Sequence, residues 1–233
     1  VHIMVGGLPE KPVPPLGYVI TWSPENLIDE YTRKARIVKK GKIVEVEALS
    51  GLEEVEFPGL GKLEAFFTDG LRTLPHTIKN VYDMWEKTLR YPGHAERVRM
   101  FKELGFFEEQ QVDVEGVEVS PRKLTVKLLG KKLWRPEVKD VVALRVEVSG
   151  VKDGKQKGYI YSLLERYDAK QCITAMARTT AYPASIIAQM MLKKIVKEKG
   201  VVPPERIGMN DELFQLFLDS LEERGIKLLE KRV

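Results

Sequence analysis

Cysteine and histidine are scarce in this 233-residue sequence, which contains one cysteine and three histidines. The single cysteine, Cys172, cannot form an internal disulfide, and no CxxC pair or His-rich segment lies near it. Because structural metal sites are built from clusters of these side chains, no metal site is expected. Cys172 is therefore predicted to be a free, buried thiol.

Long hydrophobic runs are also missing. No segment approaches the roughly 18 consecutive apolar residues that a membrane-spanning helix requires, and the N-terminal VHIMVGGLPEKP lacks the apolar core of a signal peptide. The net charge is small, because 38 Lys and Arg face 34 Asp and Glu for a formal charge of +4, and both signs alternate along the chain. These absences predict a globular, cytoplasmic protein that binds neither membranes nor nucleic acid.

Glycine-rich nucleotide-binding motifs are the third absence. The sequence has neither a GxGxxG turn nor a GxxxxGK[ST] loop, and Gly6-Gly7 leads into a proline-rich stretch rather than into a helix. No repeat, linker or shift in composition divides the chain, so residues 1–233 are expected to form one domain without a nucleotide-binding half. Since the sequence begins at Val1 instead of methionine, it is expected to be the rear part of a longer protein.

The hydrophobic patterns predict both strands and helices. Strands are expected at residues 2–7, 35–48 (two strands turned at Lys40-Gly41), 62–68, 81–91 and 141–166 (a long hairpin), with an edge strand at 226–233. Helices are expected at residues 24–32, 94–105, from 121, at 182–199 and from 211, with Ser23-Pro24, Ser120-Pro121 and Asn210 or Asp211 as their capping signals. The expected fold class is α+β, with a mostly antiparallel or mixed sheet packed against helices.

The hairpin at residues 141–166 also bears on assembly. Its length and regular alternation predict a long free strand edge, which a monomer would have to protect. A two-fold homodimer that pairs or stacks sheets is the expected solution.

Short motifs in a fixed order carry a resemblance to a known family. They are Gly6-Gly7-Leu8-Pro9, Pro15-Leu16-Gly17-Tyr18, Trp22-Ser23-Pro24, Thr88-Leu89-Arg90-Tyr91-Pro92-Gly93 and Thr174-Ala175-Met176-Ala177-Arg178-Thr179-Thr180. Together they resemble the C-terminal domain of the saccharopine dehydrogenase family. Three segments are most similar to its lysine 6-dehydrogenase branch, which oxidises the ε-amine of lysine with NAD: ENLIDEYTRKARIV, EALSGLEEVEFPGLGKLEAFFTDGLRTLPHT and KTLRYPGHAE.

The resemblance implies an enzyme in two parts. An N-terminal Rossmann domain, absent from this chain, would hold NAD or NADP, and this chain would bind the amino-acid substrate and form a homodimer or a larger homo-oligomer. The resemblance also implies contacts. Gly7, Leu8, Tyr18, Trp22, Ser23, Arg72, Arg90 and Tyr91 would face the substrate, and Gly6, Thr179, Thr180 and Tyr182 would face the cofactor. Two departures from the family pattern, Ala181 before Tyr182 and His76 after Leu-Pro, bear on the helix start and on specificity.

The chemistry of lysine sets requirements for such a site. Its ε-ammonium, with a pKa near ~10.4, must lose a proton before a hydride can leave, so an acid or base is needed beside an arginine for the α-carboxylate. In the turn Thr68-Asp69-Gly70-Leu71-Arg72, Arg72 is the predicted carboxylate clamp and Asp69 the partner of an ammonium. His94 is the second predicted catalytic residue, because histidine titrates near neutrality.

Each of these residues also has a structural interpretation. Asp69 and Arg72 could belong to an ordinary Asp-Gly turn, and His94 to a helix cap or the core. Gly6-Gly7 could form a simple turn, Tyr18 and Trp22 could be core aromatics, and Thr179 and Thr180 could cap the helix predicted from Tyr182.

Three functions therefore stay open. The chain could serve an oxidative deaminase of lysine, a saccharopine dehydrogenase proper, or a non-catalytic dimerisation or amino-acid-binding module. Saccharopine carries more carboxylates than lysine, and Arg72 and Arg90 are the only evident clamps, so lysine is favoured.

Overall fold

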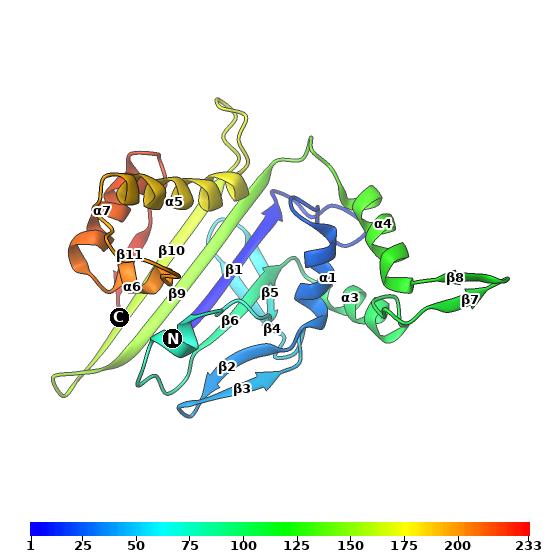
Figure 1. Cartoon of the computed structure of the whole chain (residues 1–233), viewed down its shortest axis with the longest axis horizontal. Coiled ribbons are helices and arrows are strands. Elements are labelled where there is room, and N and C mark those ends of the chain that lie inside the picture. Colours follow the sequence, from blue (N-terminus) through cyan, green and yellow to red (C-terminus); the bar gives the residue numbers. More distant parts are fainter.

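The computed structural model describes residues 1–233 and contains one large sheet with helices at both ends (Figure 1). The strands are β1 (His2–Pro9), β2 (Ala35–Lys39), β3 (Lys42–Val46), β4 (Glu53–Phe57), β5 (Gly61–Phe67), β6 (Trp85–Arg90), β7 (Val112–Val114), β8 (Val117–Val119), β9 (Asp140–Lys152), β10 (Lys155–Arg166) and β11 (Leu229–Arg232). The helices are α1 (Pro24–Thr32), α2 (Leu74–Thr77), α3 (His94–Glu103), α4 (Pro121–Leu133), α5 (Ala175–Leu192), α6 (Pro204–Gly208) and α7 (Asp211–Glu222).

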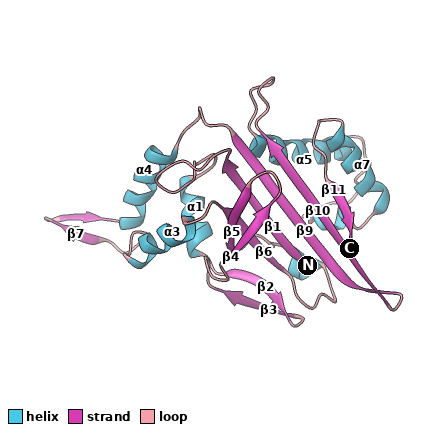
Figure 2. Cartoon of the chain, turned by 180° about the vertical axis from the view of Figure 1, so that it is seen from behind, coloured by secondary structure: helices cyan, strands magenta, loops and turns pink.

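Seven strands form the main sheet in the order β11-β10-β9-β1-β6-β5-β4. Only the β1–β6 pair is parallel, and the other neighbours are antiparallel, so the sheet is mixed. The helices α5 and α7 lie over β9 and β10, whereas α1, α3 and α4 lie beyond β6 (Figures 1 and 2). The predicted α+β class with a mixed sheet is confirmed.

Two apolar clusters hold the molecule together. One joins α1, α3 and α4 to Phe66 of β5 around Tyr18 and Tyr31. The other lies between β1, β4, β5, β6 and β9 and is centred on Leu63 and Leu89, which are fully buried. Leaving such side chains in water would cost roughly 1.5–3 kcal/mol each, so the first cluster fixes how α1 lies against β5 and the second holds the strands of the sheet together.

Local capping signals placed three helices correctly. The Ser23 and Ser120 hydroxyls accept hydrogen bonds from the Asn26 and Lys123 N–H groups, and Asn210 caps α7 in the same way. A capping side chain contributes about 1 kcal/mol and needs only residues near the helix start. Sequence is therefore sufficient to find such starts.

The start of α5 was predicted wrongly. The helix begins at Ala175, not near Tyr182, and ends at Leu192 instead of Lys199. Thr174 caps it locally, and the carboxylate of Asp140 accepts hydrogen bonds from the Ala175 and Met176 N–H groups at 2.7 and 2.8 Å. Because Asp140 comes from β9, this second cap depends on the tertiary fold.

Other predictions also fail. The hairpin at residues 141–166 keeps only part of the predicted free edge, because β9 pairs with β1 over residues 140–147 and β10 pairs with β11 over residues 159–162. Cys172 is free but exposed, because it lies in the turn before α5 instead of inside an element.

The strand β4, the β7–β8 hairpin and the short helices α2 and α6 had no clear sequence signal. No helix is long and apolar enough to cross a bilayer.

Candidate functional site

A polar cavity of about 340 Å³ lies between α1, the β5–α2 turn and β6. Charged and polar side chains form nearly all of its wall. Its lining residues are Trp22, Asn26, Asp29, Glu30, Arg33, Thr68, Asp69, Gly70, Arg72, Glu86 and Thr88. Below, this site is called the polar cavity.

The three walls follow from local sequence. Asn26, Glu30 and Arg33 recur at helical spacing on α1, whose other side buries Leu27 and Ile28. Alternation along β6 sends Glu86, Thr88 and Arg90 to the face that meets α1, while Leu89 enters the apolar cluster behind the sheet. Thr68, Asp69 and Gly70 follow directly after β5, where a turn brings the chain back over the cavity.

Asp69 and Arg72, predicted as the partner of an ammonium and as the carboxylate clamp, both line the polar cavity. Arg36 binds both carboxylate oxygens of Asp69, with Nε–Oδ1 and Nη2–Oδ2 distances of 3.0 and 2.9 Å. Arg72 approaches the same carboxylate at 3.5 Å and keeps an exposed side chain. Burial acts to raise the pKa of Asp69, but the hydrogen bonds and charges of Arg36 and Arg72 outweigh it and lower the pKa. Asp69 is thus an ionised anchor for two guanidinium groups.

Arg72 has a strained backbone. Its φ of 52° lies in the left-handed region, which a non-glycine residue adopts at a cost. Such strain is retained where surrounding contacts hold the residue in place and is common at binding sites. Here Asp69 holds the side chain at the cavity wall.

Arg90 does not face the polar cavity as a free clamp. It is 3% exposed, forms an ion pair with Glu30 at 2.8 Å, and lies over the ring of Tyr18 at 4.6 Å. Trp22, at the rim, donates from its indole Nε1 to the Tyr18 hydroxyl. Of the three aromatic residues predicted to contact the substrate, Tyr18, Trp22 and Tyr91, only Trp22 lines the cavity. Tyr18 lies in the core and holds the Trp22 indole in place through this hydrogen bond.

The prediction that His94 titrates near neutrality is wrong. The side chain is fully buried, with Nδ1 at 2.9 Å from the Leu16 carbonyl oxygen and Nε2 at 2.8 Å from the Tyr31 hydroxyl. A carbonyl only accepts, so Nδ1 carries the proton and Nε2 accepts from Tyr31. Burial, helped by the charge of Arg90, lowers the pKa of His94 to about 3. His94 is a neutral core residue in this structure.

The predicted glycine contacts are packing contacts. A Cβ on Gly6 would lie 2.5 Å from the Leu89 carbonyl oxygen, and one on Gly7 would lie 2.0 Å from Cε of Met176. Leu8 is buried in the cluster behind the sheet. The side of each glycine where a Cβ would stand is therefore occupied by the chain itself.

The remaining predicted residues also lie apart from the polar cavity. Thr179 and Thr180 donate their hydroxyls to carbonyl groups one turn earlier in α5, and the Tyr182 hydroxyl donates to Gln171. Tyr91 donates to the carbonyls of Pro9 and Glu10, and Ser23 caps α1. The contacts of Gly6, Thr179, Thr180 and Tyr182 with NAD or NADP stay a prediction.

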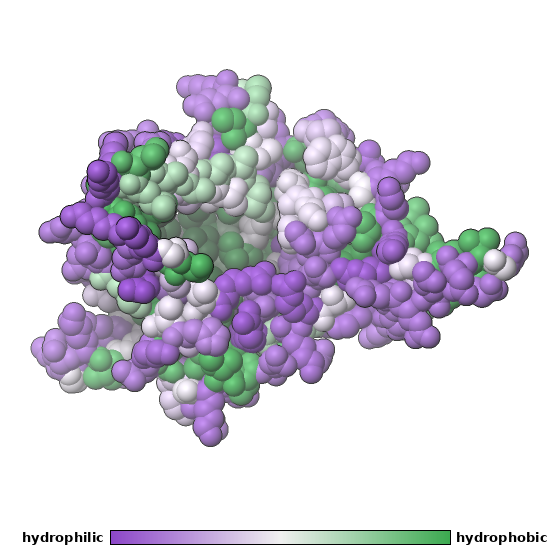
Figure 3. All heavy atoms as spheres, in the orientation of Figure 1, coloured by the Kyte–Doolittle hydropathy of each residue, from purple (hydrophilic) through white to green (hydrophobic).

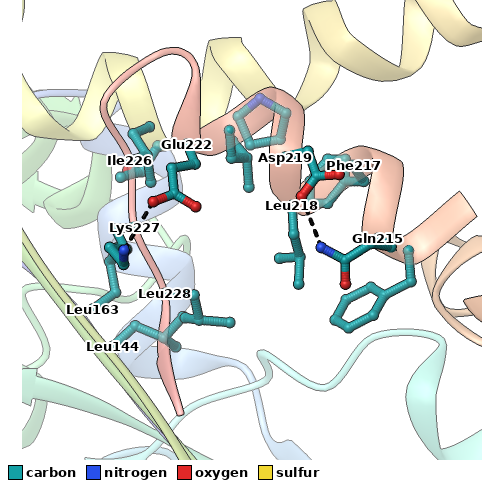
Figure 4. Close-up of a pocket in the computed structure, with 14 residues that line it drawn as sticks. Leu144, Leu163, Gln215, Phe217, Leu218, Asp219, Glu222, Ile226, Lys227 and Leu228 are labelled. Carbon is teal, nitrogen blue, oxygen red and sulfur yellow. Dashed lines mark hydrogen bonds and ion pairs between the residues drawn. The ribbon is translucent and has the colours of Figure 1, made fainter.

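A second cavity, also about 340 Å³, lies under α7 and is mainly apolar (Figure 4). Leu144 and Leu163 form its floor. Its polar side chains pair with one another, Gln215 with Asp219 at 2.7 Å and Lys227 with Glu222 at 2.8 Å. Because its wall is mainly apolar, this cavity has less to offer a reaction than the polar cavity.

Most residues of the polar cavity were not predicted from the sequence. Glu86 is its most unusual member, since it is 4% exposed and burial raises the pKa of its carboxyl to about 8. The sequence did contain one signal for this residue: Glu86 lies two residues before Thr88, so both side chains point to the same face of the strand. No group of three His, Cys, Asp or Glu side chains is placed to hold a metal ion.

Comparison with known proteins identifies relatives of the whole chain. Residues 1–226 match the model of the saccharopine dehydrogenase C-terminal domain. The chain is 35% identical over 133 residues to alpha-aminoadipic semialdehyde synthase of Arabidopsis thaliana, covering 55% of the chain and 12% of that protein. It is 23% identical over 222 residues to carboxyaminopropylagmatine dehydrogenase of Synechocystis sp., covering 90% of the chain and 53% of that protein.

A solved structure has the same fold. The chain superposes with a TM-score of 0.79 on apo saccharopine dehydrogenase (L-Glu forming) from Saccharomyces cerevisiae, at 20% identity, covering all of this chain and 66% of that one. The chain thus spans about half, or less, of the length of the curated relatives that it matches.

Proposed function

Because this chain belongs to the saccharopine dehydrogenase family, we propose that it is the substrate-binding part of an NAD(P)-dependent amino-acid dehydrogenase. Its substrate would be L-lysine, oxidised at the ε-amine to the semialdehyde, which cyclises to an imine. The cofactor, NAD or NADP, would be held by an N-terminal Rossmann domain outside this chain. Homologues named as dehydrogenases support the oxidoreductase class.

The charge of the polar cavity carries the choice of lysine. Four carboxyl groups line it, those of Asp29, Glu30, Asp69 and Glu86, against the guanidinium groups of Arg33 and Arg72. Three of these carboxyl groups pair with arginines, and only Glu86 has no cationic partner. A buried carboxyl without such a partner favours a ligand with a cationic end, because opposite charges attract strongly in a partly dry site. Lysine has two ammonium groups and one carboxylate, whereas saccharopine has more carboxylates to satisfy.

Substrate selection by the full-length protein tests this proposal. L-lysine, saccharopine and L-norleucine are each supplied with NAD and with NADP, and the reduced cofactor is followed by absorbance. Turnover of lysine alone is expected, because norleucine lacks the ε-amine. Turnover of saccharopine in place of lysine would favour the second candidate, a saccharopine dehydrogenase proper, which the structural match supports.

Replacing Arg72 is expected to weaken kcat/KM by ~10–150-fold for alanine, with lysine between alanine and the native residue. A charge-assisted hydrogen bond contributes on the order of 1.5–3 kcal/mol, and lysine keeps the charge but loses the fork. The loss should appear mainly in KM, because the carboxylate end lies away from the reacting carbon.

Steady-state kinetics and thermal unfolding together check the role of Arg72. The exposed Arg135, outside the polar cavity, provides the matched control Arg135→Ala. Since the Arg72 side chain is 62% exposed, its removal should leave stability almost unchanged. A large fall in the unfolding temperature with normal kinetics would instead make Arg72 structural.

We also propose that the protein is a homodimer. The C-terminal end of α5 supports this proposal, since Met191 and Leu192 are exposed, Leu192 to 82%, and apolar side chains gather around the hollow below α5 (Figure 3). Light scattering of the 26.6 kDa chain should give twice that mass. A monomer at high concentration would contradict the proposal.

A further inference from the structure

Glu86 differs from the other carboxyl groups of the polar cavity because it has no cationic partner. Asp29 pairs with Arg33 and Arg122, Glu30 pairs with Arg90, and Asp69 pairs with Arg36 and Arg72. Glu86 makes no ion pair, although it is more than nine-tenths buried. A buried carboxyl without a cation is costly when ionised, so this position favours either a proton or a cationic ligand.

The hydroxyl groups around Glu86 leave one of its oxygens free. Thr68 Oγ1 donates to Oε2 at 2.6 Å and lies 2.8 Å from Thr88 Oγ1. Each hydroxyl has one proton, and that of Thr68 is used on Glu86. Thr88 therefore donates to Thr68, and its 3.4 Å approach to Oε1 adds little. Oε1 is the oxygen that can exchange a proton with a ligand.

Charged groups from every neighbouring element influence this carboxyl. They are Asp29, Glu30 and Arg33 of α1, Arg36 of β2, Asp69 and Arg72 of the β5–α2 turn, and Arg90 of β6. Burial raises the pKa of Glu86 most and the charge of Glu30 raises it further, whereas the Thr68 hydroxyl, the Gly70 N–H and the charge of Arg90 lower it. The resulting pKa is about 8. The carboxyl is thus mostly neutral at pH 7 in the absence of ligand.

We propose that Glu86 binds the side-chain amine of the substrate and removes one proton from its ammonium form. This inference rests on the proposed function and names the residue that prepares the amine. As the ammonium binds, the neutral Glu86 carboxyl first loses its own proton to solvent. One N–H bond of the ammonium then breaks and one O–H bond forms on Oε1, so that one proton in all leaves the site. The electron pair of the broken bond stays on nitrogen as the lone pair that an amine needs before oxidation.

The energetics allow this transfer. An alkylammonium has a pKa near ~10.4 in water, and burial lowers it because desolvation disfavours the charged form. The same burial raises the pKa of Glu86, so the two values approach each other in the polar cavity. After the transfer both partners are neutral, which a desolvated site favours over a separated ion pair. The ligand class is therefore a primary aliphatic amine.

Proton release on ligand binding tests the proposal without requiring turnover. Calorimetry in buffers of different ionisation enthalpy measures the protons released when L-lysine binds to the full-length protein without cofactor. With a pKa of about 8, Glu86 holds about 0.9 proton at pH 7 and about 0.1 at pH 9, and lysine binding should release that amount. L-Norleucine has the same α-groups but no ε-amine, so its release is subtracted.

Matched variants separate Glu86 from the rest of the site. Glu86→Gln should abolish the lysine-specific release and weaken lysine binding on the order of 10–100-fold, without changing norleucine binding. Glu64→Gln removes a buried carboxyl from β5 outside the polar cavity and should preserve the release. Gly70→Ala supplies a second test if Glu86→Gln does not fold, because its Cβ would lie 2.5 Å from the Glu86 carboxyl and displace it.

The outcomes are distinct. Lysine binding with equal release and affinity in Glu86→Gln would overturn the role of Glu86 while leaving lysine as the substrate. Equal release by norleucine and lysine would show that Glu86 serves no side-chain amine. Absence of lysine binding to the native protein would overturn the proposed function, and this inference with it.

Discussion

Replacing Arg90 by methionine is expected to destabilise the protein by about 3–5 kcal/mol, because a buried charge would lose its partner. The Arg90 guanidinium binds Glu30 at 2.8 Å and the Leu89 carbonyl at 2.9 Å, and both side chains of the ion pair are largely buried. Without Arg90, the carboxylate of Glu30 would remain in a dry site. At roughly 2–4 °C per kcal/mol, the unfolding temperature should fall by about 6–20 °C.

A double variant is the control for this effect. Arg90→Met combined with Glu30→Leu removes both charges and should recover much of the lost stability, since two apolar side chains leave no unpaired ion. Urea unfolding at pH 7 measures each variant. If Arg90→Met instead unfolds like the native protein but loses substrate affinity, Arg90 is a substrate clamp and not a core residue.

The second large effect concerns the dependence of folding stability on pH. Two buried groups, His94 and Glu86, change the stability in opposite directions as pH rises, so their effects largely cancel in the native protein. The pKa of His94 falls from 6.5 to about 3, so its contribution to stability is complete above pH 6.5 and is lost as pH falls toward 3. The pKa of Glu86 rises from 4.5 to about 8, so its contribution is complete below pH 4.5 and is lost as pH rises toward 8. Each slope is about 1.4 kcal/mol per pH unit.

The two slopes cancel between pH 4.5 and 6.5. In this range both groups are neutral in the folded protein, whereas in the unfolded chain Glu86 has lost a proton and His94 has gained one. Glu86→Gln should therefore reveal a steady loss of stability as pH falls below 6.5. His94→Gln should reveal the reverse, a loss as pH rises from 4.5 to 8. The native protein should show little change from these two groups within the shared window.

Urea unfolding at pH 4.5, 5.5, 6.5 and 7.5 measures these slopes. The exposed His76 gives the matched control His76→Gln, which should follow the native profile. Because glutamine also changes packing, the dependence on pH is compared and not the absolute stability. Parallel profiles for all four proteins would contradict the buried, neutral state of both His94 and Glu86.

Local sequence determined the elements whose signals lie within a few residues. The alternation of Val142, Leu144, Val146 and Val148 predicts β9, and the Ser23-Pro24 and Ser120-Pro121 pairs predict α1 and α4. Such signals work because a strand face or a first helical turn is formed by its own residues. The ordered motifs also sufficed to identify the family.

The tertiary structure decided where the chemistry lies. Asp140 of β9 sets the start of α5, and the contact of Gly6 with Leu89 makes a glycine predicted for cofactor binding a packing residue. His94 loses its predicted titration because Tyr31 and Leu16, 63 and 78 residues away, enclose it.

The polar cavity shows the same division. Sequence alone predicted Asp69 and Arg72, which are neighbours in one turn, because their proximity is local. Glu86 was not predicted, because glutamates occur on several strands of this chain and only the packing of α1 and the β5–α2 turn buries this one. A burial-driven shift in pKa depends on every element around a side chain, so it arises only when the fold brings those elements together.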